Sequence, residues 1–410
     1  MRMSKKKEIV PKFRFPEFQR DGIDFVHGNK LFKSITNKNH NSDLPILAIT
    51  QDQGAVPRDQ IEYNVTVTDK SLSNYKVVEV GDFIISLRSF QGGIEYSRFK
   101  GICSPAYIIL RKREENISEL YYKYFFKTWR YIQSLNRNLE GIRDGKMISY
   151  SQFSSVKVPY PRSFKEQQKI ADCLSSIDEL IDAESRKLKA LEKYKKGLMQ
   201  KLFPAEGKTL TEWRFPEFQG CGEWKSKSIG KVCKMFSGGT PDTSKKEFYG
   251  GTIPFIRSAE INKSSTELFI TEEGFKNSSA KMVKKGDILI ALYGANSGEV
   301  ALSKIDGAIN QAILCLRHET NNVFVYHYFT HMKNWIISKY VQGGQGNLSG
   351  QIIKSVNLYF PKAEEQQKIA DFLSEIDTMI TGQSNKVEQL KAHKKGLMQG
   401  LFPSFEEADV

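Results

Sequence analysis

A few residues have types and spacings that could support chemistry. His327 and His331 are four positions apart, which could place two imidazoles on one helix face as metal ligands. Asp287, Glu299 and Lys304 can be fitted to the loose acidic-plus-lysine pattern of metal-dependent nucleases. However, no nearby cysteine or carboxylate completes the histidine set, and the apolar run after Asp287 is typical of a turn entering a buried strand. We therefore predict no catalytic and no metal-binding residue.

Motifs that bind nucleotides or methyl donors are also missing from the sequence. A phosphate-binding loop needs the pattern GxxxxGK[ST], and the nearest string, GIRDGKM at 141–147, has the wrong spacing. Neither a GxGxxG turn nor an NPPY- or DPPY-type methyltransferase motif is present. The five cysteines form no CxxC pair, so they indicate neither a disulfide framework nor a zinc site. The sequence thus predicts a chain that is not an enzyme by itself.

Basic and amide-rich loops are better candidates for function, because Arg, Lys, Asn and Gln pair with base edges while hydroxyls and lysines hold phosphates. The chain has 61 Lys plus Arg against 47 Asp plus Glu, a net charge of +14 that indicates a polyanionic partner. In the first half we select Gln51, Gln53, Arg58, Arg88, Ser89, Gln91, Arg98, Arg143 and Lys146 as DNA-binding candidates. In the second half we select Thr240, Ser244, Lys245, Lys246, Arg257, Asn262, Tyr293, Asn296, Gln311 and Asn347. The alternative for each residue is an ordinary solvated loop.

The elements that carry these loops occur twice in the chain. Residues 166–204, which begin EQQKIAD and end KKGLMQKLFP, recur at 365–403 with about 24 of 39 positions identical. The hexapeptide RFPEFQ stands at 14–19 and again at 214–219. The stretches between these landmarks have diverged, but both keep a Gly-Asp pair before an apolar run. We therefore expect two domains of one fold.

Each long repeated segment predicts a helix of about 37 residues, roughly 55 Å long, with apolar residues at heptad spacing. Basic and acidic side chains nearly balance in each of these segments, so the positive excess of the chain lies on the two domains. The residues expected to pair the helices are Ile170, Leu174, Ile177, Ile181, Glu184, Leu188, Leu191, Leu198, Ile369, Leu373, Ile376, Ile380, Gln383, Val387, Leu390 and Leu397. An antiparallel register would pair Leu188 with Ile380, Leu191 with Ile376, Leu174 with Lys394 and Glu184 with Gln383.

The repeats and prolines give the expected domain limits. We expect an N-terminal arm at 1–20, a first domain at 21–163, a first helix at 164–204 and a linker that repeats the arm at 205–220. A second domain at 221–362, a second helix at 363–403 and an acidic tail at 404–410 complete the chain.

This organisation resembles that of the specificity subunits of type I restriction-modification systems. The resemblance rests on EQQKIAD at 166–172 and 365–371, on the two KKGLMQ-x-LFP ends, and on GGTPDTSKKEFYGGTIPFIRSAEI at 238–261. It implies an α+β fold with two tandem target-recognition domains, separated by two long helices that form an antiparallel coiled coil with pseudo-twofold symmetry. Each domain would bind one half of an interrupted DNA sequence.

The resemblance also implies the partners. They are double-stranded DNA, two methyltransferase subunits that use S-adenosylmethionine, and restriction subunits that use ATP and magnesium; this chain itself would hold no cofactor. We expect a cytoplasmic protein without a membrane segment. The alternative is a coiled-coil adaptor whose basic domains bind RNA or acidic proteins.

Overall fold

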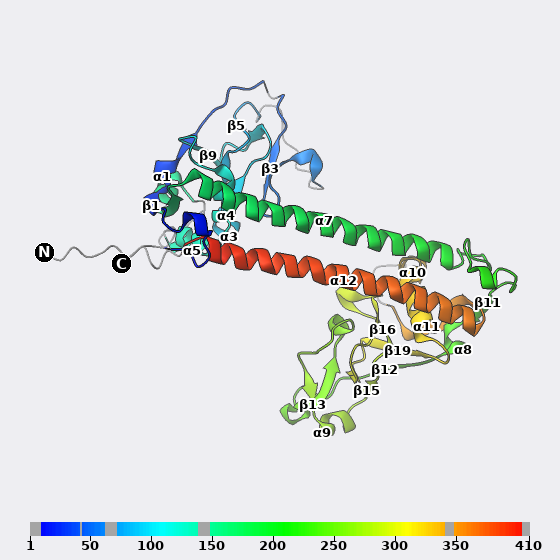
Figure 1. The fold of residues 1–410 in the computed structure, drawn as a ribbon. Helices are drawn as coiled ribbons and strands as arrows, with labels where there is room; N and C mark the ends of the chain where they lie inside the picture. The colour runs from blue at the N-terminus through cyan, green and yellow to red at the C-terminus, as the bar shows by residue number, and fades with distance from the viewer. Residues whose placement is uncertain (1–9, 42, 62–71, 138–147, 341–347, 404–410) are drawn as a thin grey trace. The chain divides into compact units, whose positions relative to one another are not determined.

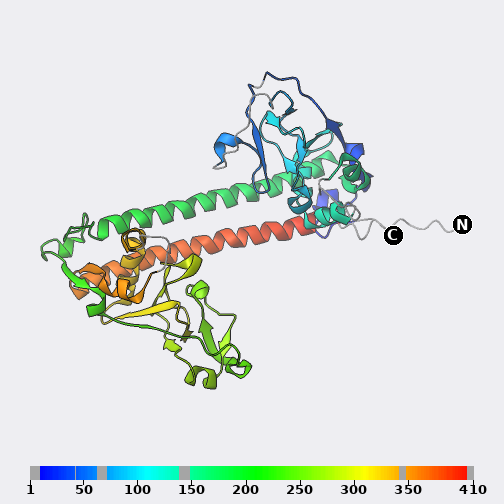
Figure 2. The same ribbon diagram turned by 180° about the vertical axis from the view of Figure 1, so that it is seen from behind.

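The computed structural model describes residues 10–41, 43–61, 72–137, 148–340 and 348–403 (Figure 1). The chain divides into two compact units: unit 1 comprises residues 1–184 and 386–410, and unit 2 comprises residues 185–385. Two helices of 39 residues, α7 (Phe164–Leu202) and α12 (Ala363–Leu401), contribute a segment to each unit. Both helices run without a break in the opposite view as well (Figure 2). No helix in the described ranges has the length and apolar character needed to cross a membrane.

Unit 1 is built on a four-stranded antiparallel sheet in the order β2–β9–β6–β7. Its strands are β2 (Phe32–Ile35), β9 (Ile108–Lys112), β6 (Phe83–Ile85) and β7 (Glu95–Tyr96). Three two-stranded sheets accompany it: β1 (Ile23–His27) with β10 (Lys157–Pro161), β3 (Leu47–Thr50) with β4 (Gly54–Pro57), and β5 (Lys76–Val78) with β8 (Gly101–Cys103). The helices are α1 (Gly28–Leu31), α3 (Ser89–Gly92), α4 (Glu119–Phe125), α5 (Trp129–Arg137) and α6 (Tyr150–Ser155).

Unit 2 repeats this sheet in the order β12–β19–β16–β17. Its strands are β12 (Cys233–Ser237), β19 (Ile313–His318), β16 (Ile288–Ala291) and β17 (Val300–Leu302). A second sheet consists of β14 (Phe269–Ile270), β13 (Tyr249–Ile256), β18 (Gly307–Ile309) and β15 (Lys281–Val283), and β11 (Lys225–Ser228) pairs with β20 (Asn357–Phe360). The helices are α8 (Ile229–Val232), α9 (Glu272–Lys276), α10 (Asn322–Tyr340) and α11 (Gly350–Ser355).

The central strands β6 and β16 form at equivalent apolar runs, and every residue of both strands is buried. A tight turn precedes each strand. Gly81 and Gly286 occupy this turn with φ of +93° and +89°, a region that residues with a Cβ avoid. The Gly-Asp pair found in both halves of the sequence therefore marks the entry to the central strand of each domain.

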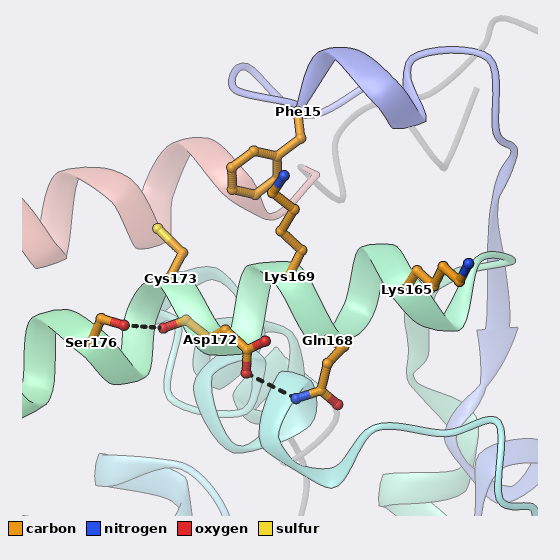
Figure 3. A pocket seen from close by; sticks show the side chains of 7 residues that line it. All are labelled: Phe15, Lys165, Gln168, Lys169, Asp172, Cys173 and Ser176. Atoms are coloured by element: carbon orange, nitrogen blue, oxygen red, sulfur yellow. Dashed lines mark hydrogen bonds between the residues drawn. The ribbon is translucent and has the colours of Figure 1, made fainter.

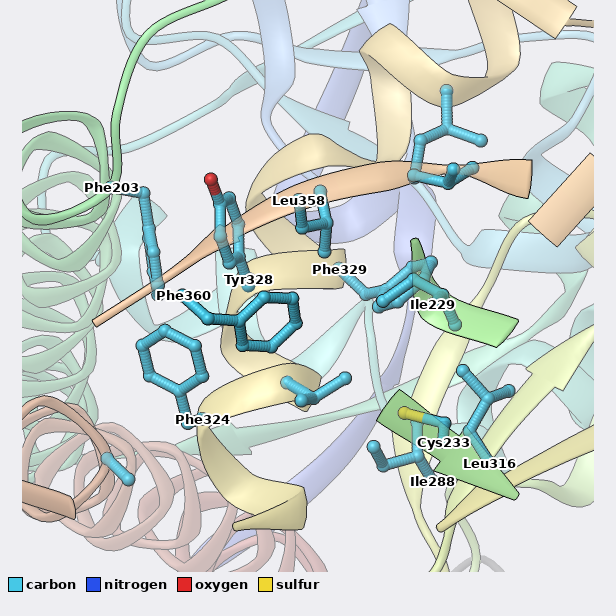
Figure 4. Close-up of a cluster of buried hydrophobic side chains, with 14 of the residues drawn as sticks. Phe203, Ile229, Cys233, Ile288, Leu316, Phe324, Tyr328, Phe329, Leu358 and Phe360 are labelled. Carbon is cyan, nitrogen blue, oxygen red and sulfur yellow. The ribbon is translucent and has the colours of Figure 1, made fainter. Parts of the chain in front are cut away.

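Each unit has its own hydrophobic core, and the end of one long helix completes it. In unit 2, Phe203 after α7 packs with Phe324, Tyr328 and other buried side chains from the sheet and α10 (Figure 4). In unit 1, Phe402 after α12 packs in the same way on Tyr121 and Phe125. Each domain is thus closed by the helix of the opposite repeat.

Within unit 1, the segments of α7 and α12 run antiparallel. Asp178 accepts a hydrogen bond from Lys394, and Glu184 accepts one from Lys386, so residue numbers rise along one helix as they fall along the other. In unit 2, Lys195 donates to Asp377, the equivalent of the pair between Lys394 and Asp178 with the repeats exchanged. The helix pairing in the two units therefore follows the internal repeat.

Candidate nucleic-acid interface

Both domains are fixed at the central strand by the same ion pair, in which a buried aspartate binds a partly exposed arginine. Arg111 donates two hydrogen bonds of 2.7 Å to the carboxylate of Asp82 in unit 1, and Arg317 donates bonds of 2.8 and 2.6 Å to Asp287 in unit 2. Asp287 also accepts the backbone N–H of Lys284, which closes the turn before β16. Asp287 therefore has the structural role that its sequence context indicates.

In unit 1, two loops that carry DNA-binding candidates lie together. The Gln51 side chain donates to the Arg88 carbonyl oxygen at 3.4 Å, and Gly92 lies so close that an added Cβ would be 2.8 Å from Gln51 side-chain atoms. The side chains of Gln51, Arg88 and Gln91 are exposed. The β3–β4 turn and the segment after β6 thus form one polar surface.

Lys127 connects these two loops, a role that sequence reasoning missed. Its ammonium donates to the carbonyl oxygens of Gln51 and Gly92 and to the carboxylate of Glu95, which is 2% exposed. Burial raises the pKa of Glu95 and lowers the pKa of Lys127, although each charge opposes the shift of the other. Because these partners are 32 to 76 positions from Lys127, no local sequence pattern could identify the contact.

The other candidates of unit 1 have different surroundings. Ser89 is 1% exposed and its hydroxyl accepts the N–H of Ser86, so it shapes the turn and presents no surface to a ligand. Arg58 is partly buried, whereas Gln53 and Arg98 are exposed. Arg143 and Lys146 lie outside the described residues.

In unit 2, the Thr240 hydroxyl donates to Gln311 at 2.7 Å, which brings two candidates from distant loops together. The hydroxyl and N–H of Ser244 both bind Asp242, while Lys245 and Lys246 are exposed. The turn at Asp242 therefore holds the two lysines on the surface.

Arg257 is held by two carboxylates. It donates to Glu260 at 3.0 and 3.1 Å and to Glu267 at 2.7 Å. The hydrogen bonds from Arg257 lower the pKa of the buried Glu260 carboxyl to about 2 and, reciprocally, raise the pKa of Arg257. The Arg257 side chain is 44% exposed, so part of it faces solvent, but its guanidinium already binds two carboxylates.

Asn262 and Asn296 line one small cavity of about 350 Å³ on unit 2. Tyr293 is 43% exposed at the start of the same loop as Asn296, directly after β16. This position is equivalent to that of Arg88 and Gln91 after β6. Candidates therefore follow the central strand in both domains, whereas Asn347 lies outside the described residues.

The residues chosen for helix pairing lie on the covered side of each helix. Ile170, Leu174, Ile369, Leu373, Ile376, Gln383 and Val387 are buried. Ile177, Ile181, Glu184, Leu188, Leu191, Leu198, Ile380, Leu390 and Leu397 are partly buried. The expected register places Lys394 opposite Leu174, and the Lys394 ammonium binds Asp178, one helical turn further along α7. This offset is expected because helical side chains lean toward the N-terminus of their own helix, here α12.

The repeated hexapeptide and the repeated helix start are joined in each unit. Arg14 donates to both oxygens of Glu166 at 2.7 and 2.9 Å, and Arg214 does the same to Glu365 at 2.7 and 2.6 Å. Beside the first of these pairs, Phe15 and Lys169 line a shallow cavity along α7, with the Lys169 ammonium 5.0 Å from the ring centre (Figure 3). RFPEFQ and EQQKIAD therefore interact with each other.

The residues with possible chemistry have structural surroundings. His331 stacks on Phe203, and burial lowers the pKa of His327 to about 3. Glu299 pairs with Lys333, and no group of three or more His, Cys, Asp or Glu residues converges within the described ranges. All five cysteines are free thiols.

Two copies of one α+β domain, each with candidate polar side chains after the same central strand, are the arrangement expected of a protein that recognises DNA. The comparisons give the family. The model of the type I restriction modification DNA specificity domain matches residues 21–193 and 222–392. The chain therefore belongs to this family.

Individual relatives and structures agree. A Methanocaldococcus jannaschii chain assigned as the MjaX type I restriction enzyme specificity subunit is 26% identical over 306 residues, covering 72% of this chain and 70% of that one. The MjaVIII specificity subunit of the same organism is 23% identical over 82% of this chain and 81% of its own length. The crystal structure of the type I S subunit from M. genitalium matches with a TM-score of 0.61 at 16% identity, covering 97% of this chain and all of that chain.

These matches confirm the expected fold class, two tandem α+β domains with long helices, and the role of a DNA specificity subunit. The alternative of an adaptor for RNA or acidic proteins finds no support among them.

Proposed function

We propose that this chain recognises a bipartite, interrupted duplex sequence, with one half-site for each recognition domain. The internal repeat carries the proposal: β6 and β16, their Asp-Arg pairs and their glycine turns are equivalent, while the loops after these strands differ. An equivalent scaffold with different loops provides two surfaces of different sequence preference. The two half-sites should therefore differ.

We further propose that the chemistry belongs to partner chains. Two methyltransferase subunits would supply methyl transfer with S-adenosylmethionine, and restriction subunits would supply cleavage with ATP and magnesium. The isolated chain would position them without methylating or cutting DNA. Its acidic residues that resemble nuclease ligands, Asp287 and Glu299, are already engaged by Arg317 and Lys333.

The test begins with mapping of methylated sites in cells with and without this chain, which identifies the target. The purified chain should then shift a duplex with this target and bind a random duplex more weakly by about a thousandfold or more, with an affinity that falls as salt rises. Equal binding to both duplexes, or labelled methyl transfer by the chain alone, would refute the proposal.

Replacing residues 21–163 with the corresponding domain of another specificity subunit gives a second test. Together with the methyltransferase subunits, the new protein should direct methylation to sites with one altered half, because unit 2 has its own core and its own loops. A change in both halves would show that the domains do not act separately.

A further inference from the structure

The α4 helix of unit 1 is joined to the long helices by a tyrosine. Tyr124 is 3% exposed, and its hydroxyl donates to Asp178 on α7 at 2.8 Å. Lys394 on α12 donates to the other oxygen of this carboxylate. Burial raises the pKa of the Tyr124 hydroxyl, so this group stays neutral in any neutral or acidic medium. The contact therefore remains closed when the medium is mildly acidified.

The equivalent position of unit 2 holds a histidine. The aromatic packing at the ends of the long helices aligns α10 with α4, and it places His327 where unit 1 has Tyr124. Lys195 and Asp377 repeat the ion pair between the long helices. The Nδ1 atom of His327 lies 3.9 Å from Asp377 Oδ2, which is too far for a hydrogen bond. The contact that Tyr124 makes in unit 1 is thus missing at the same position of unit 2.

His327 is buried with both ring nitrogens unsatisfied. The side chain is 1% exposed, and neither Nδ1 nor Nε2 has a hydrogen-bond partner among the described residues. Buried polar groups almost always have such a partner, and a buried charge without one is costlier still. Burial, aided by the nearby Lys195 ammonium, lowers the pKa of His327 to about 3. The folded domain therefore accepts this histidine only in its neutral form.

The groups that face His327 do not stabilise a proton on it. Lys195 on α7 repels a second cation, and Asp377 on α12 is already bound by that lysine. On α10 itself, the centres of the Tyr326 and His327 rings are 4.9 Å apart, and burial also lowers the pKa of His331, one turn further. The strands that pack against α10 contribute apolar side chains to the core, among them Ile290, Val300 and Leu316. A proton on His327 is therefore stabilised only when the imidazole reaches water.

We propose that His327 makes the closure of unit 2 sensitive to protons: acidification opens the contact between α10 and the neighbouring segments of α7 and α12, whereas Tyr124 makes unit 1 resistant to the same change. The strands β16, β17 and β19 pack against α10, and the loop with the candidates Tyr293 and Asn296 follows β16. Opening therefore loosens one of the two candidate recognition surfaces and leaves the other in place. The acid sensitivity itself does not depend on what these loops bind.

The pH range follows from the two states of His327. In the opened state the imidazole has its ordinary pKa of 6.5, whereas in the closed state its pKa is about 3. Stability is therefore complete above pH 6.5 and falls as the pH drops from 6.5 toward 3, because the opened state binds the proton first. Between pH 7.5 and 5.0, this residue should raise the equilibrium constant for unfolding of unit 2 by about thirtyfold. Glu260, also in unit 2, has a carboxyl pKa of about 2 and keeps its charge at pH 5.0.

Exchange of the histidine for the residue of the other repeat tests the proposal. Urea unfolding of the full chain is followed at pH 7.5 and 5.0 by tryptophan fluorescence. This signal reports mainly on unit 2, which contains three of the four tryptophans, Trp213, Trp224 and Trp335. His327→Tyr should remove the rise of about thirtyfold, because tyrosine is neutral at both pH values. His327→Gln, which is also neutral, should remove the rise even if the variant is less stable at both pH values.

His393→Tyr is the matched control. His393 is exposed on α12, and α7 has Tyr194 at the equivalent position, so this variant also copies the residue of the other repeat. It should keep the pH dependence of the wild type. An equal pH dependence in the wild type, His327→Tyr and His327→Gln would overturn the inference. So would His327 variants that lose more stability relative to the wild type at pH 5.0 than at pH 7.5, since a protonated His327 would then be bound by Asp377.

Discussion

Several charged side chains form buried ion pairs that stabilise the two domains. Side chains engaged in this way are not available to bind a ligand. Arg14 and Arg214 are 5% and 11% exposed and are committed to Glu166 and Glu365. Arg257 is also committed, although it is half exposed. Removing one partner of such a pair leaves an uncompensated charge, which costs more than the pair itself contributes.

Glu260 should make the stability of unit 2 depend on pH. Its carboxyl pKa is lowered from 4.5 to about 2 by Arg257, so its stabilising effect is complete above pH 4.5 and is lost as the pH falls toward 2. We expect Glu260→Gln to cost about 2 kcal/mol at pH 7, allowing for screening at the half-exposed Arg257. Urea unfolding at a series of pH values should show this difference shrinking below pH 4.5.

Glu267→Gln is the matched control, because Glu267 binds the same arginine but is 77% exposed. Its cost should stay within about 0.5 kcal/mol. Equal costs for the two substitutions, or a difference for Glu260→Gln that is constant with pH, would contradict the assignment of the ion pair.

Arg88 is the strongest single candidate for a base contact in unit 1, since its backbone is held by Gln51 while its side chain is exposed. Arg88→Ala should weaken target binding by about 1–3 kcal/mol and relax specificity at one position of the first half-site. Competition with targets substituted in either half measures both effects.

Arg113→Ala removes the same charge from an exposed side chain of the same domain that contacts the Asn29 carbonyl oxygen. Arg113→Ala should change the affinity for all targets, substituted or not, by the same factor. A uniform loss for Arg88→Ala as well would place Arg88 on a phosphate.

Residue type alone selected the DNA-binding candidates, and the structure shows where that criterion is insufficient. Ser89 was chosen as a polar loop residue, but its hydroxyl is used inside the turn. Arg257 was chosen as a DNA-binding candidate, but two carboxylates bind it. Both contacts are local in the sequence, but residue type alone does not show which neighbouring polar groups bind each other.

At the scale of elements, the repeats and the heptad pattern predicted the long helices well, because periodicity is a local property of the sequence. The helices that follow the sheet in each domain, and the residues they pack against, were not predictable. Unit 2 has one helix, α10, where unit 1 has α4 and α5 with a break at 126–128. The partners of these helices, Phe402 and Phe203, come from the opposite repeat, about 280 and 120 positions away.

Leu174 and Leu180 on α7 allow a direct test of the covered face. Leu174 is fully buried in the unit 1 core, whereas Leu180 is 43% exposed. Leu174→Ala should destabilise unit 1 by about 3 kcal/mol through lost burial and a cavity. Leu180→Ala, the same chemical change on the same helix, should cost about 0.5 kcal/mol or less.

Urea unfolding of the full chain, followed by a probe in unit 1, measures both variants. The test is whether Leu174→Ala lowers the free energy of unfolding more than Leu180→Ala does. A larger cost for Leu180→Ala would show that the opposite face of α7 is covered.

At the scale of the whole molecule, the division into units shows which parts of the long helices belong to each domain core and which parts lie between the cores. The unit 1 core contains Ile170 and Leu174 of α7 with Leu401 of α12, and the unit 2 core contains Met199 and Leu202 of α7 with Leu373 of α12. The stretches next to Glu184 and Asn385, where the units meet along the chain, lie outside these cores. Insertions there should leave both domains folded.

The final prediction uses this division to ask whether the helices set the gap between half-sites. Seven residues inserted after Glu184 and seven after Asn385 preserve the heptad pattern and lengthen each helix by roughly 10 Å at 1.5 Å per residue. At about 3.4 Å per base pair, the interrupted target should gain about three base pairs in its gap while both half-sites stay the same. Methylation mapping with the lengthened chain measures the gap. Insertion into α7 alone is the control, since it shifts one helix of the pair against the other and should abolish specific binding. An unchanged gap after the double insertion, with both half-sites still recognised, would show that the distance between half-sites is set by something other than the helices.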